Sequence, residues 1–237
     1  DAEDQFFECQ PPPTAALPCS VGVQRTWVVE TSAQAQDLAA AVSCSGGSFE
    51  VEWRGSVVVK EPIYVADGTV LSVSGDGASA VVDGNSTTRL FTVVNATLHV
   101  SGVNISNGAS TVGGAIAAAG STLTLNRTNF IGNSAIAGGG GAVYVSDGSS
   151  MACVGGGTFA ENRAATDGGA LYATDSSTVS CGGLWVNNVA SDSAGAVAVF
   201  HLSSMSWSEE TTFSYNSAGK NGGAMGIFDG SSASWSG

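Results

Sequence analysis

Basic residues are scarce in this chain of 237 residues, where seven Lys and Arg stand against 20 Asp and Glu and the formal net charge is −13. A surface this acidic repels phosphate groups, so we expect neither a nucleic-acid partner nor binding to an anionic membrane. Charged residues make up only 11% of the chain and hydrophobic residues 43%, a balance that excludes an intrinsically disordered protein. Leu, Lys and Glu are few, which argues against a helical bundle.

Long hydrophobic runs are also missing, since none approaches the ~20 residues that a membrane-spanning helix needs. We therefore expect no insertion into a membrane. The chain begins at Asp1 rather than Met, which we interpret as an N-terminus left after removal of a signal peptide. Five cysteines fit a secreted or cell-surface protein with some disulfides. Their odd number leaves at least one thiol free or paired with another chain.

Glycine is abundant, with 33 residues, and much of it belongs to a repeat. Triplets of the Gly-Gly-Ala type recur about every 27 residues. They occupy residues 113–115, 140–142, 168–170, 194–196 (Ala-Gly-Ala) and 222–224. Self-similarity at this period is typical of solenoid proteins, in which each unit buries its apolar face only by stacking on its neighbours.

A second motif, an aromatic residue followed three positions later by Asn, keeps the same period. Its members are Phe130 and Asn133, Phe159 and Asn162, Trp185 and Asn188, and Phe213 and Asn216. Asn107 fills the same position one unit earlier, without the aromatic residue. Between the motifs, apolar residues alternate with polar ones over four to six positions, which predicts about three short strands per unit.

These patterns predict an all-β protein, a single-stranded parallel β-helix whose coils lie ~4.8 Å apart. Like residues then lie over like residues. The aromatic residues of the second motif would form an internal column. The asparagines would lie at a turn, some in left-handed conformations, with their amides bonded between coils. The paired glycines would supply positive φ and close backbone approach.

The chain divides into three predicted parts. Residues 1–30 form an extended, acidic and Pro-rich arm. Residues 31–50 form a capping helix and a loop, with Thr31 or Ser32 as N-cap and with Leu38 and Val42 as an apolar pair one turn apart. Residues 51–237 form the β-helix, and its coils are less regular from 51 to 112.

The two motifs together resemble the repeats of chlamydial polymorphic membrane proteins, and also the secreted β-helix proteins of algae and other stramenopiles. The resemblance covers roughly residues 51 to 237. It implies a right-handed parallel β-helix at a cell surface that acts in adhesion or as a structural fibre.

The cysteines suggest two disulfides. Cys153 and Cys181 lie one coil apart in the same column, so their Cα atoms should lie within ~4.4–6.8 Å. The alternative is a pair of buried thiols that pack as small apolar groups. For the N-terminal region we expect Cys19–Cys44, which leaves Cys9 to replace Cys19 or to pair with another chain.

A polar column follows the glycine triplets and consists of Asp147, Asp175, His201 and Asp229. Its three aspartates are weak candidates for a calcium site or an acid/base pair. Sequences such as Asp-Gly-Ser are ordinary turn formers, and we favour that interpretation. Lys and Arg are scattered, and the chain lacks known catalytic motifs. We therefore assign no catalytic residue, no metal and no cofactor, and expect no enzyme.

Four Asn-x-Ser/Thr sequons begin at Asn85, Asn95, Asn104 and Asn126. We expect glycans on at least two of them if the source is eukaryotic.

The functional hypothesis is a secreted structural glycoprotein. It would form an extracellular fibre, appendage or coat whose subunits, copies of this chain, assemble head-to-tail. This hypothesis rests on the odd cysteine and on the unequal ends, because the last unit stops at Gly237 without a polar cap. Either the chain is a fragment of a longer one, or another molecule covers that end. The alternative is a polysaccharide-binding adhesin, which an outward stripe such as Tyr144 over Tyr172 would support. A polysaccharide lyase or hydrolase is the third hypothesis.

Overall fold

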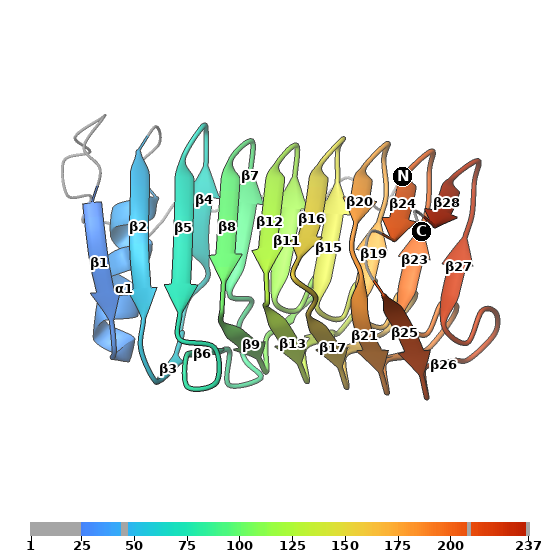
Figure 1. The fold of residues 1–237 in the computed structure, drawn as a ribbon, viewed down its shortest axis with the longest axis horizontal. Coiled ribbons are helices and arrows are strands. Elements are labelled where there is room, and N and C mark those ends of the chain that lie inside the picture. The colour runs from blue at the N-terminus through green and yellow to red at the C-terminus, as the bar shows by residue number, and fades with distance from the viewer. Residues whose placement is uncertain (1–24, 44–46, 208–209, 236–237) are drawn as a thin grey trace.

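The computed structural model describes residues 25–43, 47–207 and 210–235. The chain winds into a parallel β-helix of about eight turns with ~26 residues per turn. Every strand pair is parallel, and neighbouring coils lie side by side along the rod (Figure 1). The predicted right-handed parallel β-helix is therefore confirmed. No helix in the described part of the chain is long and apolar enough to cross a membrane.

The strands form four sheets that run along the rod. Sheet A contains β1 (Arg25–Val29), β2 (Ser48–Trp53), β5 (Val70–Gly75), β8 (Thr97–Ser101), β12 (Thr122–Asn126), β16 (Ser150–Val154), β20 (Thr178–Ser180), β24 (Ser204–Trp207) and β28 (Ser232–Trp235). Sheet B contains β3 (Ser56–Val58), β6 (Val81–Asp83), β9 (Asn104–Ser106), β13 (Asn129–Ile131), β17 (Thr158–Ala160), β21 (Gly183–Val186) and β25 (Thr211–Ser214).

The other two sheets complete each coil. Sheet C contains β4 (Ile63–Ala66), β7 (Phe91–Val94), β11 (Ile116–Ala119), β15 (Val143–Ser146), β19 (Leu171–Ala173), β23 (Val197–Val199) and β27 (Met225–Ile227). Sheet D contains the two-residue strands β10 (Ala109–Ser110), β14 (Ser134–Ala135), β18 (Arg163–Ala164), β22 (Val189–Ala190) and β26 (Ser217–Ala218). The later coils thus have four strands rather than the predicted three. The fourth lies between the Asn motif and the glycine triplet.

The core is one continuous apolar column inside the coils. In β12, for example, Leu123 and Leu125 point inward and are buried, while Thr122 is exposed. This alternation follows from the period of two in a strand. Equivalent inward residues of neighbouring coils pair in register, as Leu98, Leu123 and Met151 do in sheet A.

The predicted helix is present as α1 (Ser32–Val42), and it covers the N-terminal end of the core. Thr31 is the N-cap, and its hydroxyl accepts a hydrogen bond from the Gln34 backbone N–H at 3.3 Å. Leu38 and Val42 are buried, and the helix contacts β1, β3 and β4. Strand β1, which we expected to be part of the extended arm, pairs with β2. The parallel sheet therefore begins nearer the N-terminus than the sequence suggested.

The two glycines of each triplet have different roles. The first adopts positive φ, with values of 68° at Gly140 and 63° at Gly168, and Ala194 adopts 60° in the same position. The second glycine of every triplet but the last lies where a Cβ would overlap backbone atoms of the next coil. At Gly169 that Cβ would lie 2.7 Å from the Val189 nitrogen. A β-carbon is therefore excluded at this corner of the coil.

Candidate functional site

The aromatic residues of the second motif form a single internal column, as predicted. Phe130 pairs with Phe159, Phe159 with Trp185, and Trp185 with Phe213 across the neighbouring strands of sheet B. Their ring centroids are 4.9, 3.9 and 5.9 Å apart, and all three pairs are stacked. The first three rings are fully buried and Phe213 is half-buried.

The asparagines of the same motif form a hydrogen-bonded ladder parallel to this column. Oδ1 of Asn162 accepts hydrogen bonds from the backbone N–H and from Nδ2 of Asn133, both at 3.0 Å. Nδ2 of Asn162 donates to Oδ1 of Asn188 at 3.0 Å and to the Phe130 carbonyl at 3.1 Å. Asn188 contacts Asn216 in the same way. Each amide therefore satisfies backbone groups that the turn leaves without strand partners.

Two details of this ladder differ from the prediction. The left-handed residue is the one before each ladder asparagine, such as Gly132 (φ 66°) or Asn187 (φ 54°), and not the asparagine itself. Asn107 is such a preceding residue, with φ 51°. The ladder position of its coil is Gly108, whose backbone N–H donates to Oδ1 of Asn133 at 2.8 Å.

A second buried ladder was not predicted. It consists of serines at the turn before sheet A: Ser121, Ser149, Ser177, Ser203 and Ser231. The backbone N–H of Ser121 donates to Oγ of Ser149 at 3.0 Å, that of Ser177 to Oγ of Ser203 at 3.1 Å, and that of Ser203 to Oγ of Ser231 at 3.1 Å. The ladder is interrupted between Ser149 and Ser177, whose buried hydroxyl has no hydrogen-bond partner among the described residues. The later serines stand two residues after each member of the polar Asp/His column. This regular two-residue offset from the polar column could have revealed the serine ladder in the sequence.

The aromatic-x-x-Asn motif and the Gly-Gly-Ala triplet show which known repeat this chain is similar to. Three segments match the Chlamydia polymorphic membrane protein repeat. They are residues 127–146, 155–174 and 210–224, and each contains one aromatic-x-x-Asn motif and one Gly-Gly-Ala triplet. The coil with Trp185 and Ala194, which departs from both consensus residues, lies outside these segments. No curated protein and no solved structure gives a significant match.

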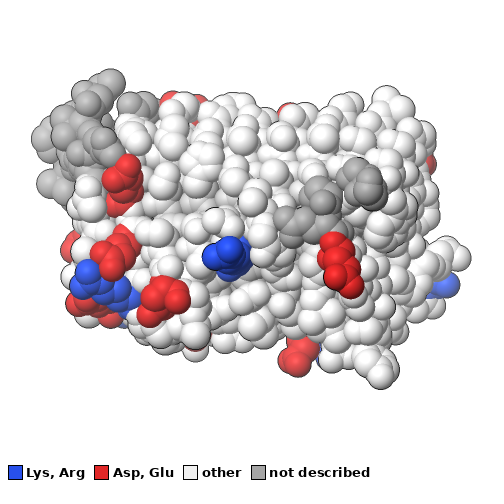
Figure 2. Space-filling view, in the orientation of Figure 1, with Lys and Arg blue, Asp and Glu red and all other residues white. Residues whose placement is uncertain are grey.

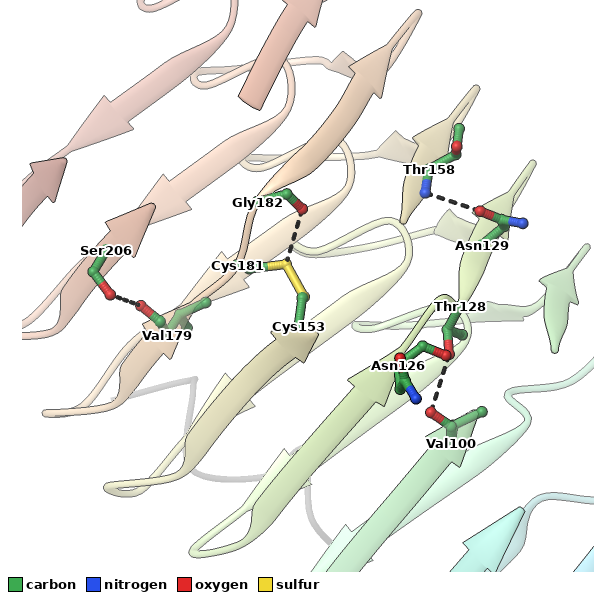
Figure 3. The surroundings of a disulfide bond; sticks show 10 residues. All are labelled: Val100, Asn126, Thr128, Asn129, Cys153, Thr158, Val179, Cys181, Gly182 and Ser206. Atoms are coloured by element: carbon green, nitrogen blue, oxygen red, sulfur yellow. Dashed lines mark hydrogen bonds between the residues drawn. A yellow bond between two sulfur atoms is a disulfide. The ribbon is translucent and has the colours of Figure 1, made fainter. Parts of the chain in front are cut away.

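Cys153 and Cys181 form a disulfide between neighbouring coils of this repeat array, with Cα atoms 4.5 Å apart (Figure 3). Cys153 lies in β16 and Cys181 follows β20, and both are buried. The bond links two elements already adjacent in the fold. Cys9, Cys19 and Cys44, which include the other predicted pair, lie outside the described residues.

Removing this disulfide should lower the stability of the rod without changing its fold. The bond closes a segment with a sequence separation of 28, for which the loss of unfolded-state entropy corresponds to about 3.6 kcal/mol. We expect the Cys153→Ala/Cys181→Ala protein to unfold at lower urea than the oxidised wild type. Reduced wild type should unfold close to the variant. Equal midpoints for oxidised wild type and variant would contradict this expectation.

The column of Asp147, Asp175, His201 and Asp229 has the geometry of a row of turns. All four residues adopt positive φ, between 49° and 55°. His201 lies between two of the aspartates, with Nδ1 3.7 Å from Asp175 Oδ1 and Nε2 3.5 Å from Asp229 Oδ2. All three side chains are about half exposed. Within the described ranges, no group of three or more His, Cys, Asp or Glu is arranged to hold a metal ion.

The four sequons differ in how strongly their amides are engaged. Asn85 and Asn95 are exposed at turns, each with φ 49°. Nδ2 of Asn104 donates to the Gly77 carbonyl at 2.9 Å, and its Oδ1 accepts from Asn129 at 2.8 Å. Nδ2 of Asn126 donates more weakly, to Ser101 Oγ at 3.2 Å.

We expect glycans at Asn85 and Asn95 but not at Asn104 when the chain is secreted from eukaryotic cells. A glycan on Asn104 would displace the hydrogen bonds that join it to the neighbouring coils. Mass spectrometry of the glycopeptides gives the occupancy of each site. Full occupancy of Asn104 in folded protein would show that these bonds are dispensable.

An outward aromatic stripe exists on sheet C, but its geometry does not suit a sugar platform. Tyr144 stacks on Tyr172, Tyr172 on Phe200 and Phe200 on Phe228, with centroids 5.2, 5.1 and 4.4 Å apart. The interplanar angles are 6°, 15° and 18°. Because the rings lie face to face along the rod, their faces contact one another and mainly their edges meet solvent. The stripe therefore joins neighbouring coils by ring stacking on the outside of the rod, as the column that begins at Phe130 does inside.

Two basic residues, Arg89 and Lys220, bind to neighbouring groups of the fold. Arg89 donates to the carbonyls of Val112 and Gly113 at 2.7 and 3.1 Å, and thereby holds the start of the first glycine triplet. Burial lowers the pKa of the Arg89 guanidinium to about 10. Lys220 pairs with Asp192 at 2.8 Å, and this hydrogen bond raises the pKa of the lysine.

The outer face of sheet A is flat and rich in hydroxyl groups. The pairing register places exposed or half-exposed Ser and Thr side chains over one another from coil to coil. The longest such row is Thr97, Thr122, Ser150, Thr178, Ser204 and Ser232. Near the N-terminal end the face contains a hollow of about 410 Å³. It is lined by Thr26, Glu50, Val51, Glu52, Ser72, Val73, Ser74, His99 and Ser101.

Proposed function

We propose that this chain is a structural rod of an extracellular or cell-surface layer. The ladders carry this proposal: aromatic rings stack from coil to coil, asparagine amides hydrogen-bond along the axis, and most neighbouring serines of the second ladder are also hydrogen-bonded. Such bonding stabilises neighbouring coils against separation and leaves few side chains committed to other tasks. A repeat array with this organisation is suited to a mechanical or spacing role.

The similarity to the polymorphic membrane protein repeat supports a surface location. The matched repeats are those of polymorphic membrane proteins. In addition, a disulfide such as Cys153–Cys181 persists in an oxidising compartment. The proposal includes no catalytic step.

Head-to-tail assembly of identical chains is the finer part of the proposal. Helix α1 covers one end of the core, while the last described coil exposes Trp235 by 62% and leaves Met225 and Ile227 half-buried. A second copy that adds strands to β25, β27 and β28 would bury these residues and extend the sheets. A contact of this type does not close on itself, so it generates filaments.

Negative-stain microscopy of the purified chain tests the assembly. We expect filaments whose width equals that of one rod and whose length grows with protein concentration. A Trp235→Lys protein should remain monomeric, because it places a charge in the proposed contact. Wild-type protein that stays monomeric at millimolar concentration would refute head-to-tail assembly.

A further inference from the structure

The hollow on sheet A has a floor of small side chains with longer side chains beside them. The register places Ser72 between Glu50 on β2 and His99 on β8. In the next row of the same strands, Ser74 lies between Glu52 and Ser101. Since successive strands are ~4.8 Å apart, the Glu50 and His99 side chains stand about 10 Å from each other. That width accommodates one sugar ring.

The two glutamates of the hollow differ in their charge environment. Glu52 accepts two hydrogen bonds from the Arg54 guanidinium, at 2.8 and 3.0 Å, and these bonds lower the pKa of its carboxyl group. Glu50 makes no ion pair with any of the described residues. It therefore offers a solvent-exposed carboxylate whose two oxygens can accept hydrogen bonds from a ligand.

Beyond the hollow, the outward strand positions of sheet A carry no Asp, Glu, Lys or Arg. From β5 to β28 its outward residues are mainly Ser and Thr, together with Val70, His99, Asn126, Ala152 and Val154. In Figure 2 charged side chains gather at the left end, over β1 and β2, and a basic side chain lies near the lower ends of β8 and β12. The outward strand positions that lead away from the hollow thus offer hydroxyl groups and no charge.

We propose that the outer face of sheet A binds a neutral polysaccharide. One sugar unit lies over Ser72 and Ser74, where its hydroxyl groups donate to Glu50 and contact the His99 imidazole. The following units lie along the Ser and Thr rows, which both donate and accept hydrogen bonds. This binding role goes beyond the structural role proposed above.

Charge and composition select this ligand over others. An anionic polysaccharide or a nucleic acid would meet the Glu50 carboxylate and the net charge of −13. Protein interfaces usually need buried aromatic or arginine anchors, and the outward positions of β5 to β28 contain neither. A metal ion needs a group of ligands that the described residues do not form.

The two histidines of the chain give a direct binding assay. His99 lines the hollow, whereas His201 lies in the turn between Asp175 and Asp229. The imidazole proton resonances should be recorded while cellohexaose, laminarihexaose, mannohexaose or an oligogalacturonate is added. We expect at least one neutral hexasaccharide to shift the His99 resonances and leave those of His201 unchanged. The oligogalacturonate should shift neither.

Three variants separate the hollow from the rest of the surface. Ser72→Leu fills the floor and should abolish binding. Glu50→Gln loses the charged acceptor and should weaken binding about tenfold. Ser106→Leu makes the same change as Ser72→Leu on the outer face of sheet B, and it should bind like wild type. Circular dichroism should confirm that all three proteins are folded.

Three results would overturn the proposal. The first is that no neutral probe at millimolar concentration shifts the His99 resonances. The second is that the Ser72→Leu protein binds as well as wild type. The third is that only the anionic probe produces a shift. Filament formation is measured separately, so the failure of either proposal is distinguishable from the failure of the other.

Discussion

Replacing Gly169 with alanine should destabilise the rod by more than about 4 kcal/mol, enough to unfold its middle coils. The new Cβ would overlap the Gly195 carbonyl oxygen and lie 2.7 and 2.8 Å from the nitrogen and carbonyl carbon of Val189. All of these are backbone atoms of the next coil. No side chain can rotate away, so relief requires the coils themselves to separate.

The matched control is Gly148→Ala. Gly148 has φ 69°, but a Cβ there would meet no atom within 4 Å. Only the left-handed backbone opposes this alanine, at a cost of about 1–2 kcal/mol. Urea unfolding followed by circular dichroism should show a large loss for Gly169→Ala and a small one for Gly148→Ala. Equal losses would mean that the contact between coils at Gly169 costs no more than left-handed backbone strain does at Gly148, and would contradict this account.

Replacing Asn162 with leucine should cost about 4 kcal/mol, although the side chain keeps its size. The change removes the acceptor for two Asn133 donors and the donor to the Phe130 carbonyl. Asn133 and Asn162 are fully buried, so water cannot replace these bonds. Each buried polar group left without a partner costs about 1–3 kcal/mol.

Asn129→Leu provides the comparison for this ladder. Asn129 also bonds between coils, to Asn104 at 2.8 Å and to the Thr158 backbone N–H at 3.0 Å. It lies half-exposed on the outer face of sheet B, where water can satisfy the groups it leaves. We expect a loss of at most about 1 kcal/mol. A loss as large as that of Asn162→Leu would show that burial is not what makes the inner ladder strong.

The sequence predicted the features that depend on the repeat itself. Equal spacing fixes which residues lie over one another, so the Phe130 column and the Asn162 ladder followed from counting. The different roles of the two glycines in a triplet could not be predicted from the spacing. Positive φ at Gly168 and close backbone approach at Gly169 depend on how sharply the chain bends. Strand β1 was missed because the helix interrupts the pattern between β1 and β2.

The outer surface was the least predictable part. The outward stripe of Tyr144 and Tyr172 was foreseen, but the period of two says only that a side chain points outward. It does not say that the rings lie face to face, which depends on the spacing of the coils and on side-chain rotation. The hollow at Ser72 was missed because it arises from the different heights of three neighbouring side chains, and only the register places these side chains together.

Pulsed electron paramagnetic resonance between pairs of nitroxide labels tests the stacking of coils most directly. Ser48, Thr97, Thr122 and Ser232 occupy equivalent outward positions of sheet A. With Ser232 labelled, partners at Thr122, Thr97 and Ser48 lie four, five and seven coils away. The account predicts distances of about 19, 24 and 34 Å, one step of ~4.8 Å per coil. Distances that do not rise in equal steps with the number of coils would contradict it.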